Sequence, residues 1–240
     1  MRWTRALRGD TLTCALGNKK TASIQLTQPP ACEAHGYDAN QAPSCRFAGT
    51  TAFAVADADG NMVAATHTLG TWGGNFYVTP GLGFIYNDNL GSYPSDSNAY
   101  GARLPFERNG STIAPTIVFE GNGAQRHAVM ALGAAGNSWI TSAVYQTLVG
   151  MIDDHLDPQA VLELPRFLLG GGRIGPGGGI SVQMENGFAP AVIDRLRELG
   201  YTPQIISLMG ELRMGYGAAV EIKDGKVLAG ADPRRSGAVT

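Results

Sequence analysis

Cysteine is scarce in this chain, and all three cysteines (Cys14, Cys32 and Cys45) precede residue 50. The region after them therefore cannot depend on disulfide bonds of its own, while a Cys32–Cys45 bridge is neither required nor excluded. Charged residues are few and balanced, with 18 Lys and Arg against 20 Asp and Glu. The net charge of −2 gives no electrostatic basis for binding nucleic acid or an anionic membrane surface.

Long apolar runs are also missing. No stretch of ~18 apolar residues occurs, which predicts that nothing in the sequence spans a membrane. The first ten residues carry basic side chains but lack the apolar segment of a signal peptide, so localisation stays open. The four histidines (His35, His67, His127 and His155) do not have the spacing of metal ligands, so the sequence predicts no metal site.

The composition divides the chain into two parts. Residues 1–49 are rich in Gln, Pro, Asn, Ala and Thr and show no persistent periodicity, which predicts a poorly ordered N-terminal arm. Residues 50–240 alternate apolar runs with turn signals, and their length is sufficient for one hydrophobic core. We expect this second part to be the folded domain.

Three turn signals between apolar runs predict β-hairpins: Asp59-Gly60, residues 121–123 (Gly-Asn-Gly) and Asp224-Gly225. Further apolar runs favour three additional strands. The expected strands are 51–57 with 62–69, 113–119 with 126–132, 217–223 with 226–231, and singly 82–87, 179–184 and 203–208.

Helical spacing of apolar residues predicts a helix from Ser138 to His155. Asp157-Pro158 is typical of a helix start, and residues 190–199, followed by Gly200, predict a third helix. Residues 170–175 formally fit the dinucleotide motif GxGxxG, but no helix follows, so we predict a flexible turn. Hairpins in stacked sheets with helices outside indicate a layered α+β fold.

Gly49 and Thr50 form the most informative pair in the chain. A threonine hydroxyl needs a base to become a nucleophile, and cleavage of the Gly49–Thr50 bond would supply one, because the freed α-amine of Thr50 titrates near pH ~8. Glycine suits the position before the bond, since a backbone without Cβ can adopt a strained geometry against the hydroxyl. On its own, the same pattern also fits an ordinary strand entered from a loop.

Four sequence blocks follow one another after Gly49: residues 50–69, 111–118, 132–138 with 164–167, and 230–235. Together they resemble the small subunit of the γ-glutamyltransferase family, whose members are N-terminal-nucleophile (Ntn) hydrolases. The resemblance implies a four-layer αββα sandwich and chemistry that needs no metal and no cofactor. It also implies a large-subunit partner, of which residues 1–49 would be a remnant.

The resemblance assigns roles to single residues. Thr50 would be the nucleophile, first in self-cleavage after Gly49 and then on substrate. Thr68 lies at the family position that hydrogen-bonds and orients the nucleophile. Gly136 and Asn137 lie in the family's oxyanion loop, where Asn137 replaces the second of two glycines. Backbone N–H groups at a helix start can stabilise an oxyanion whatever the side chain.

Substrate-binding positions match the family less well. Ser111 and Thr112 match a serine pair that binds the substrate carboxylate, and the plain alternative is two surface residues before a strand. A family asparagine is Gly70 here, and a family glutamine is Asn89. The family aspartate that pairs with the substrate ammonium aligns with Ser92, and Asp88 or Asp96 would have to compensate through a rearranged loop.

Two hypotheses of different classes follow. The first is a threonine Ntn hydrolase or acyltransferase that acts on γ-glutamyl amides such as glutathione, or, given Gly70 and Ser92, on another acyl amide as in the related cephalosporin acylases. The second is an inactive, truncated subunit that needs a separate large-subunit partner or self-associates, because half of a four-layer fold leaves apolar faces uncovered.

Overall fold

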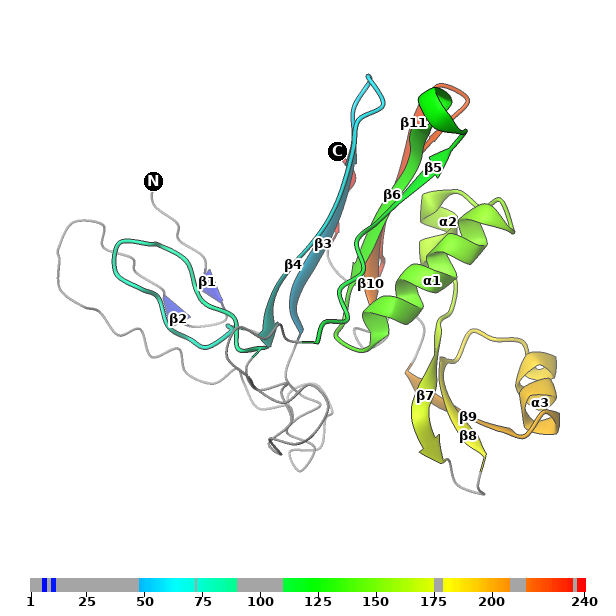
Figure 1. The fold of residues 1–240 in the computed structure, drawn as a ribbon. Helices are drawn as coiled ribbons and strands as arrows, with labels where there is room; N and C mark the ends of the chain where they lie inside the picture. Colours follow the sequence, from blue (N-terminus) through cyan, green and yellow to red (C-terminus); the bar gives the residue numbers. More distant parts are fainter. Residues whose placement is uncertain are drawn as a thin grey trace.

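The computed structural model describes residues 6–7, 10–11, 48–71, 73–89, 110–174, 179–207, 215–234 and 237–240 (Figure 1). Most of the predicted arm, including the three cysteines, lies outside these residues. Within it, β1 (Ala6–Leu7) and β2 (Asp10–Thr11) pair antiparallel, and β3 (Ala48–Ala56) begins two residues before the expected domain start. The division of the chain at residue 49 stays a prediction.

A four-stranded antiparallel sheet forms the centre of the fold, in the order β11-β10-β6-β5. Its outer pair β10–β11 turns at Asp224-Gly225, where both residues have positive φ, as a two-residue hairpin turn requires. The predicted hairpins are confirmed with shifted ends, and the turn before β6 includes a short 3-10 helix. The strands are β5 (Thr116–Glu120), β6 (His127–Ala135), β10 (Tyr216–Lys223) and β11 (Lys226–Ala231).

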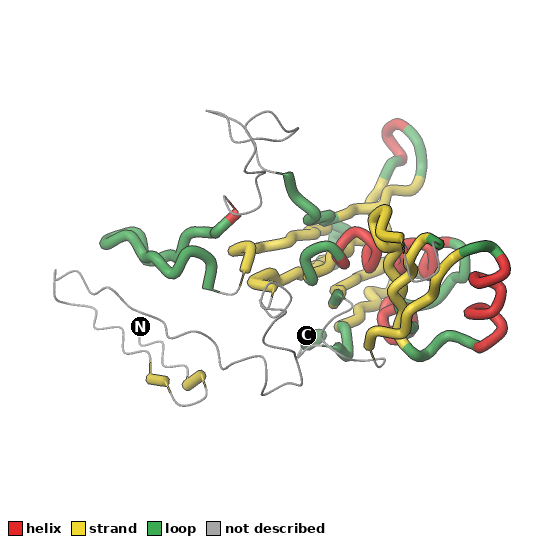
Figure 2. Tube along the Cα trace, turned by 90° about the horizontal axis from the view of Figure 1, so that it is seen from below, coloured by secondary structure: helices red, strands yellow, loops and turns green. Residues whose placement is uncertain are grey.

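The hairpin of β3 and β4 (Met62–Thr71) forms a second layer against β6 and β10 (Figure 1, and from below in Figure 2). The facing surfaces carry small side chains: a Cβ built on Gly133 of β6 would lie 3.6 Å from Cβ of Ala52 and 3.3 Å from Oγ1 of Thr66. Small residues on both surfaces let the two sheets approach closely. The start of β3 is thereby held against the end of β6.

Two helices cover the other face of the four-stranded sheet, α1 (Trp139–Ile152) and α2 (Pro158–Glu163). Both agree with the predicted helices, and the Asp157 side chain caps α2 by accepting a hydrogen bond from Ala160 N at 2.9 Å. Strand β6 is covered on both faces, which explains why residues 129–135 are all buried. Its helix-facing residues join α1 and α2 in the main hydrophobic core.

A smaller sheet, β7-β8-β9, follows the helices. Strand β7 (Phe167–Ile174) pairs antiparallel with β8 (Ile180–Glu185), which pairs parallel with β9 (Tyr201–Ser207) after the crossover helix α3 (Pro190–Glu198). Helix α3 and strands β8 and β9 lie where the sequence predicts them. Gly200 ends the α3 turn with φ +85, a conformation that favours glycine.

Two expectations were wrong. Residues 82–87 form no strand and contribute only an isolated bridge between Val78 and Ile85, because Gly81 and Gly83 adopt positive φ and interrupt the extended backbone. Residues 170–174 are not a turn, since they complete β7. Within the described part of the chain, no helix is both long and apolar enough to cross a membrane.

Candidate active site

Thr50, the predicted nucleophile, is 2% exposed and lies on the face of β3 that packs against the four-stranded sheet. It pairs directly with Thr68 of β4, and the two hydroxyl oxygens are 2.8 Å apart. Thr68 Oγ1 also accepts a hydrogen bond from Gly70 N at 2.9 Å. The two contacts hold the Thr68 hydroxyl oxygen between Gly70 N and the Thr50 hydroxyl.

The predicted scissile bond lies at an irregularity of the ladder. Thr50 pairs with Thr68, but Ala48 pairs with Thr71, so the register between β3 and β4 shifts across Gly49. Such irregularities interrupt the regular hydrogen bonding of a sheet and are over-represented next to active sites. The peptide between Gly49 and Thr50 is therefore the least regular part of an otherwise continuous strand.

Gly70 lies directly against two polar side chains. Its φ is +88, and a Cβ added there would overlap Asp88 Oδ1 and lie 2.8 Å from Asn89 Oδ1. Asp88 N also donates a hydrogen bond to Leu69 O at 2.9 Å. The absence of a side chain at Gly70 thus makes room for a carboxylate and an amide next to the Thr50–Thr68 pair. Ser92 and Asp96 lie outside the described residues.

Gly136 and Asn137 form the turn between β6 and α1, with φ of +127 and +53. Asparagine is one of the few residues that tolerate the left-handed region, so the replaced glycine does not abolish the turn. Trp139 N and Ile140 N donate to the carbonyl oxygens of Gly136 and Asn137 at 3.1 and 3.2 Å. Asn137 and Ser138 come just before these two donors in the chain, and their N–H groups lie at the positive end of the α1 dipole.

Ser111 and Thr112 are both exposed in the extended segment that leads into β5. Ser111 Oγ accepts a hydrogen bond from Ile113 N at 3.3 Å, which organises the segment locally. Thr112 O accepts one from Thr141 Oγ1, in the first turn of α1, at 3.5 Å. This contact brings the pair to the same helix end as Gly136 and Asn137.

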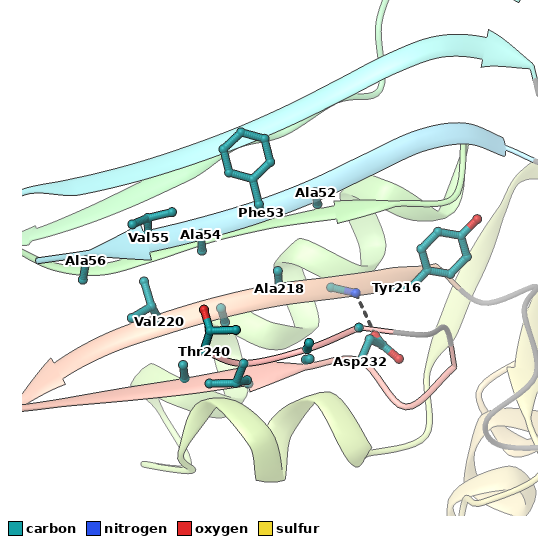
Figure 3. Close-up of a pocket in the computed structure, with 18 of the residues that line it drawn as sticks. Ala52, Phe53, Ala54, Val55, Ala56, Tyr216, Ala218, Val220, Asp232 and Thr240 are labelled. Carbon is teal, nitrogen blue, oxygen red and sulfur yellow. Dashed lines mark hydrogen bonds between the residues drawn. The ribbon is translucent and has the colours of Figure 1, made fainter. Parts of the chain in front are cut away.

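The predicted residues therefore fall into two groups. One is Thr50, Thr68, Gly70 and Asn89, joined by Asp88, and the other is the α1 start with Ser111 and Thr112. Strand β3 stacks on β6 and β10, and its first residues lie near the last residues of β6 and the first residues of β10. In Figure 3, Ala52 lies on the same side as Tyr216, and Ala56 lies on the same side as Val220.

Four charged side chains are buried at this end of the fold. Arg166 Nη1 lies 2.6 Å from Asp232 Oδ2, Arg234 Nη2 lies 2.6 Å from Glu185 Oε2, and Arg234 Nη1 lies 3.2 Å from Asp232 Oδ1. Burial lowers the pKa of Arg166, which Asp232 opposes. Burial also acts to lower the pKa of Arg234, but hydrogen bonds to Glu185 and the charge of Asp232 outweigh it and raise that pKa. Two cations and two anions thus compensate one another.

These charges are what sequence reasoning did not find. Arg234 is paired with Glu185 and Asp232, while Arg235 lies outside the described residues. Gly215 was also missed, although it packs against Gly136. No local pattern signals these contacts, because Arg166, Glu185 and Arg234 belong to distant segments.

The described residues contain no group of three or more His, Cys, Asp or Glu side chains that could hold a metal ion.

Comparisons with known proteins identify the family. The gamma-glutamyltranspeptidase family model matches residues 9–240. The glutathione hydrolase proenzyme of Pseudomonas sp. (strain A14) is 33% identical over 135 residues, which cover 52% of this chain and 23% of that protein. The chain spans between 23% and 34% of the length of the first curated relatives it matches.

Solved structures agree with this. A gamma-glutamyltranspeptidase from Pseudomonas nitroreducens in complex with L-DON is similar with a TM-score of 0.61 and 27% identity, over 79% of this chain and 98% of that chain. A cephalosporin acylase from Bacillus halodurans is similar with a TM-score of 0.63 and 25% identity, over 78% of this chain and 33% of that chain. The fold is the α+β fold of the Ntn hydrolases, and the chain belongs to the gamma-glutamyltranspeptidase family.

Proposed function

We propose that this chain carries the nucleophile and the oxyanion donors of a threonine Ntn hydrolase or acyltransferase that acts on γ-glutamyl amides. The observation that carries the proposal is the 2.8 Å contact between the hydroxyls of Thr50 and Thr68, beside the irregular Gly49–Thr50 bond. A strand residue with a purely structural role needs neither a buried hydroxyl partner nor a glycine at a ladder irregularity before it.

Self-cleavage comes first. Thr50 Oγ1 attacks the carbonyl carbon of Gly49, the C–N bond breaks, and an ester with a free Thr50 α-amine results. Water then hydrolyses the ester and releases the carboxylate of Gly49. The new α-amine is the base for the second reaction, in which it takes the proton of the Thr50 hydroxyl as that oxygen attacks a substrate amide. The amine leaving group departs, and water or an amine acceptor takes the acyl group from Thr50.

The turn before α1 supplies the oxyanion donors in this proposal. The negative oxygen of each tetrahedral intermediate would accept hydrogen bonds from the N–H groups of Asn137 and Ser138, which stand at the positive end of the helix. A donor of this kind is worth about 10²–10³-fold in rate. Thr68 keeps the Thr50 oxygen directed toward the reacting carbonyl.

The substrate contacts are divided between the two groups of residues. The hydroxyls of Ser111 and Thr112 would bind the substrate carboxylate. The Asp88 carboxylate, seated at Gly70 and beside Asn89, would bind the substrate ammonium instead of position 92. If the ammonium is not bound there, the favoured alternative is another acyl amide, for which the cephalosporin acylase with the similar fold is the precedent.

A partner chain belongs to the proposal. On the outer face of the β3–β4 hairpin, Phe53 is 46% exposed and Val55 and Val63 are each 51% exposed, which is high for apolar side chains in a sheet. A groove of about 670 Å³ also runs between β3 and the β10–β11 pair (Figure 3). A large-subunit partner would cover these surfaces, and self-association of the chain is the alternative.

Intact-mass measurement of the purified protein tests the proposal. The chain should yield a fragment that begins at Thr50, Thr50→Ala should leave it uncut, and Thr51→Ala should cleave normally. Thr51 is the matched control because it is exposed on the opposite face of the same strand. Hydrolysis of a γ-glutamyl anilide should be lost only with Thr50→Ala. Activity that survives this substitution would rule out Thr50 as the nucleophile.

A further inference from the structure

The buried charges described above are linked to the start of β10. Arg166 Nη1 donates a hydrogen bond to Gly215 O at 2.9 Å. Asp232 Oδ2, the ion-pair partner of Arg166, accepts a hydrogen bond from Gly217 N at 2.7 Å. The two side chains therefore hold the backbone on both sides of Tyr216, the residue that pairs with the end of β6 at Ala135.

Gly215 in turn packs on the turn before α1. A Cβ built on Gly136 would lie only 2.7 Å from Gly215 Cα, so the two backbones are in direct contact with no room for a side chain between them. Gly215 is buried, with φ +77, and space for a Cβ there is limited by Ala143 and Trp139 of α1 at 3.2 and 3.4 Å. A displacement of Gly215 therefore moves Gly136 and the first turn of α1.

We propose that Arg166 is a positioning residue, which acts through its hydrogen bond to the Gly215 carbonyl to fix the Gly136–Asn137 turn. Asp232 supports it by neutralising the buried guanidinium and by holding Gly217. The inference rests on the proposed oxyanion role of this turn. It assigns Arg166 a role in rate, beyond the stability that any buried ion pair provides.

Arg234 belongs to the same buried cluster and supplies a control of identical chemistry. Its Nη1 and Nη2 donate to the carbonyl oxygens of Leu162 and Leu164, each at 2.7 Å, and it pairs closely with Glu185. These bonds hold the connection from α2 to β7, and Arg234 is linked to β10 only indirectly, through Asp232. The two arginines are both buried and both ion-paired, and both donate to Leu162 O, Arg166 through Nη2 at 3.4 Å. They differ in that Arg166 also donates to Gly215 O, whereas Arg234 donates to Leu164 O.

The experiment compares Arg166→Lys with Arg234→Lys in the full-length protein. Lysine keeps the charge but lacks the planar guanidinium of Arg166, whose Nη1 contacts Asp232 and Gly215 O while Nη2 donates to Leu162 O. Both variants should lower the melting temperature. Only Arg166→Lys should lower kcat for a γ-glutamyl anilide, by about 10- to 100-fold, because a misplacement of ~1 Å in an active site costs this much. KM should change by less than about threefold, as expected for an interaction made in the transition state.

Hydrogen exchange measured by mass spectrometry gives a second measure that does not need activity. Amides of residues 136–140 should exchange faster in Arg166→Lys than in Arg234→Lys. If Arg166→Lys does not fold, Asp232→Asn replaces it, since it retains the shape and an acceptor for Gly217 and removes the charge.

Equal effects of the two lysine variants on kcat and on exchange would overturn the inference, as would unchanged exchange at residues 136–140 in Arg166→Lys. If exchange differs as expected but no form of the protein hydrolyses the anilide, the proposed function fails and the positioning role stands. If Thr50→Ala abolishes activity but exchange is the same in both variants, the positioning role fails and the proposed function stands.

Discussion

Replacement of Gly70 by alanine tests the contact between Gly70 and Asp88. The added Cβ would overlap Asp88 Oδ1 and would lie 2.8 Å from Asn89 Oδ1. Both are side-chain atoms, so the cheapest response is rotation of the Asp88 carboxylate away from Gly70. The φ of +88 at Gly70 adds the penalty of a Cβ in the left-handed region, about 1–2 kcal/mol.

The effect on activity should exceed the effect on folding. A hydrogen bond to a charged group is worth about 1.5–3 kcal/mol, so loss of the proposed Asp88–ammonium contact corresponds to a decrease of about 10- to 150-fold in kcat/KM. Most of it should appear as a higher KM, because the ammonium is bound before and during the reaction. A mild loss of stability alone leaves kcat/KM of the folded protein unchanged.

The assay is a double-mutant cycle of Gly70→Ala and Asp88→Ala, with kcat/KM for a γ-glutamyl anilide and the melting temperature as readouts. If Gly70→Ala acts by displacing Asp88, it should have little further effect in the Asp88→Ala background. The same cycle with an acyl anilide that lacks the ammonium should show no loss from either substitution. Additive losses on the γ-glutamyl substrate, or equal losses on both substrates, would refute the reasoning.

Three further predictions concern stability. Glu221 is buried, its Oε2 finds no hydrogen-bond partner among the described residues, and burial raises its pKa. The folded state should therefore lose stability as pH rises from about 4.5 through the raised pKa. Glu221→Gln should raise the melting temperature at pH 7 and have no effect below pH ~4.5. Asp157→Ala removes the cap of α2 and should cost about 1 kcal/mol in urea unfolding, with Asp154→Ala as the control, because Asp154 is exposed and is the cap residue of neither α1 nor α2. Gly230→Ala would place a Cβ 2.6 Å from the backbone of Pro158, so it should lower the melting temperature without changing KM.

Local chemistry explains which parts of the fold could be predicted. The β3–β4 and β10–β11 hairpins follow from Asp-Gly turns between apolar runs, and α2 follows from Asp157 before Pro158. Strand β7 could not be predicted, because Gly170–Gly172 have no strand preference and lie where the register between β7 and β8 shifts, between Leu169 and Ile174. The pairing of Thr50 with Thr68 could be predicted in part: once the turn is placed at Asp59-Gly60, the register of the β3–β4 hairpin sets these two residues opposite each other.

The buried charges could not be inferred from sequence for a different reason. Isolated Arg, Glu and Asp residues are usually solvated, and only the tertiary fold brings Arg166, Glu185, Asp232 and Arg234 together. The position of Asp88 was an open question in sequence, because its use depends on the path of the loop after β4. The structure places its carboxylate at Gly70.

The sequence blocks that identify the family do not all carry the same information about function. Within the third and fourth blocks, the segments Leu164–Phe167 and Gly230–Arg235 contribute the buried arginines and Asp232. Removal of any one of these side chains would leave an uncompensated charge inside the protein. Such ion pairs stabilise the fold whatever the domain acts on, and Arg166 has in addition the positioning role proposed above. In the proposed reaction, Thr50 and Thr68 instead serve acyl transfer directly, since a buried hydroxyl pair adds little to a sheet. In the same proposal the choice of acyl group depends on Gly70 and Asp88, so substrate profiling of variants at these two positions tests specificity more directly than changes in the matched blocks.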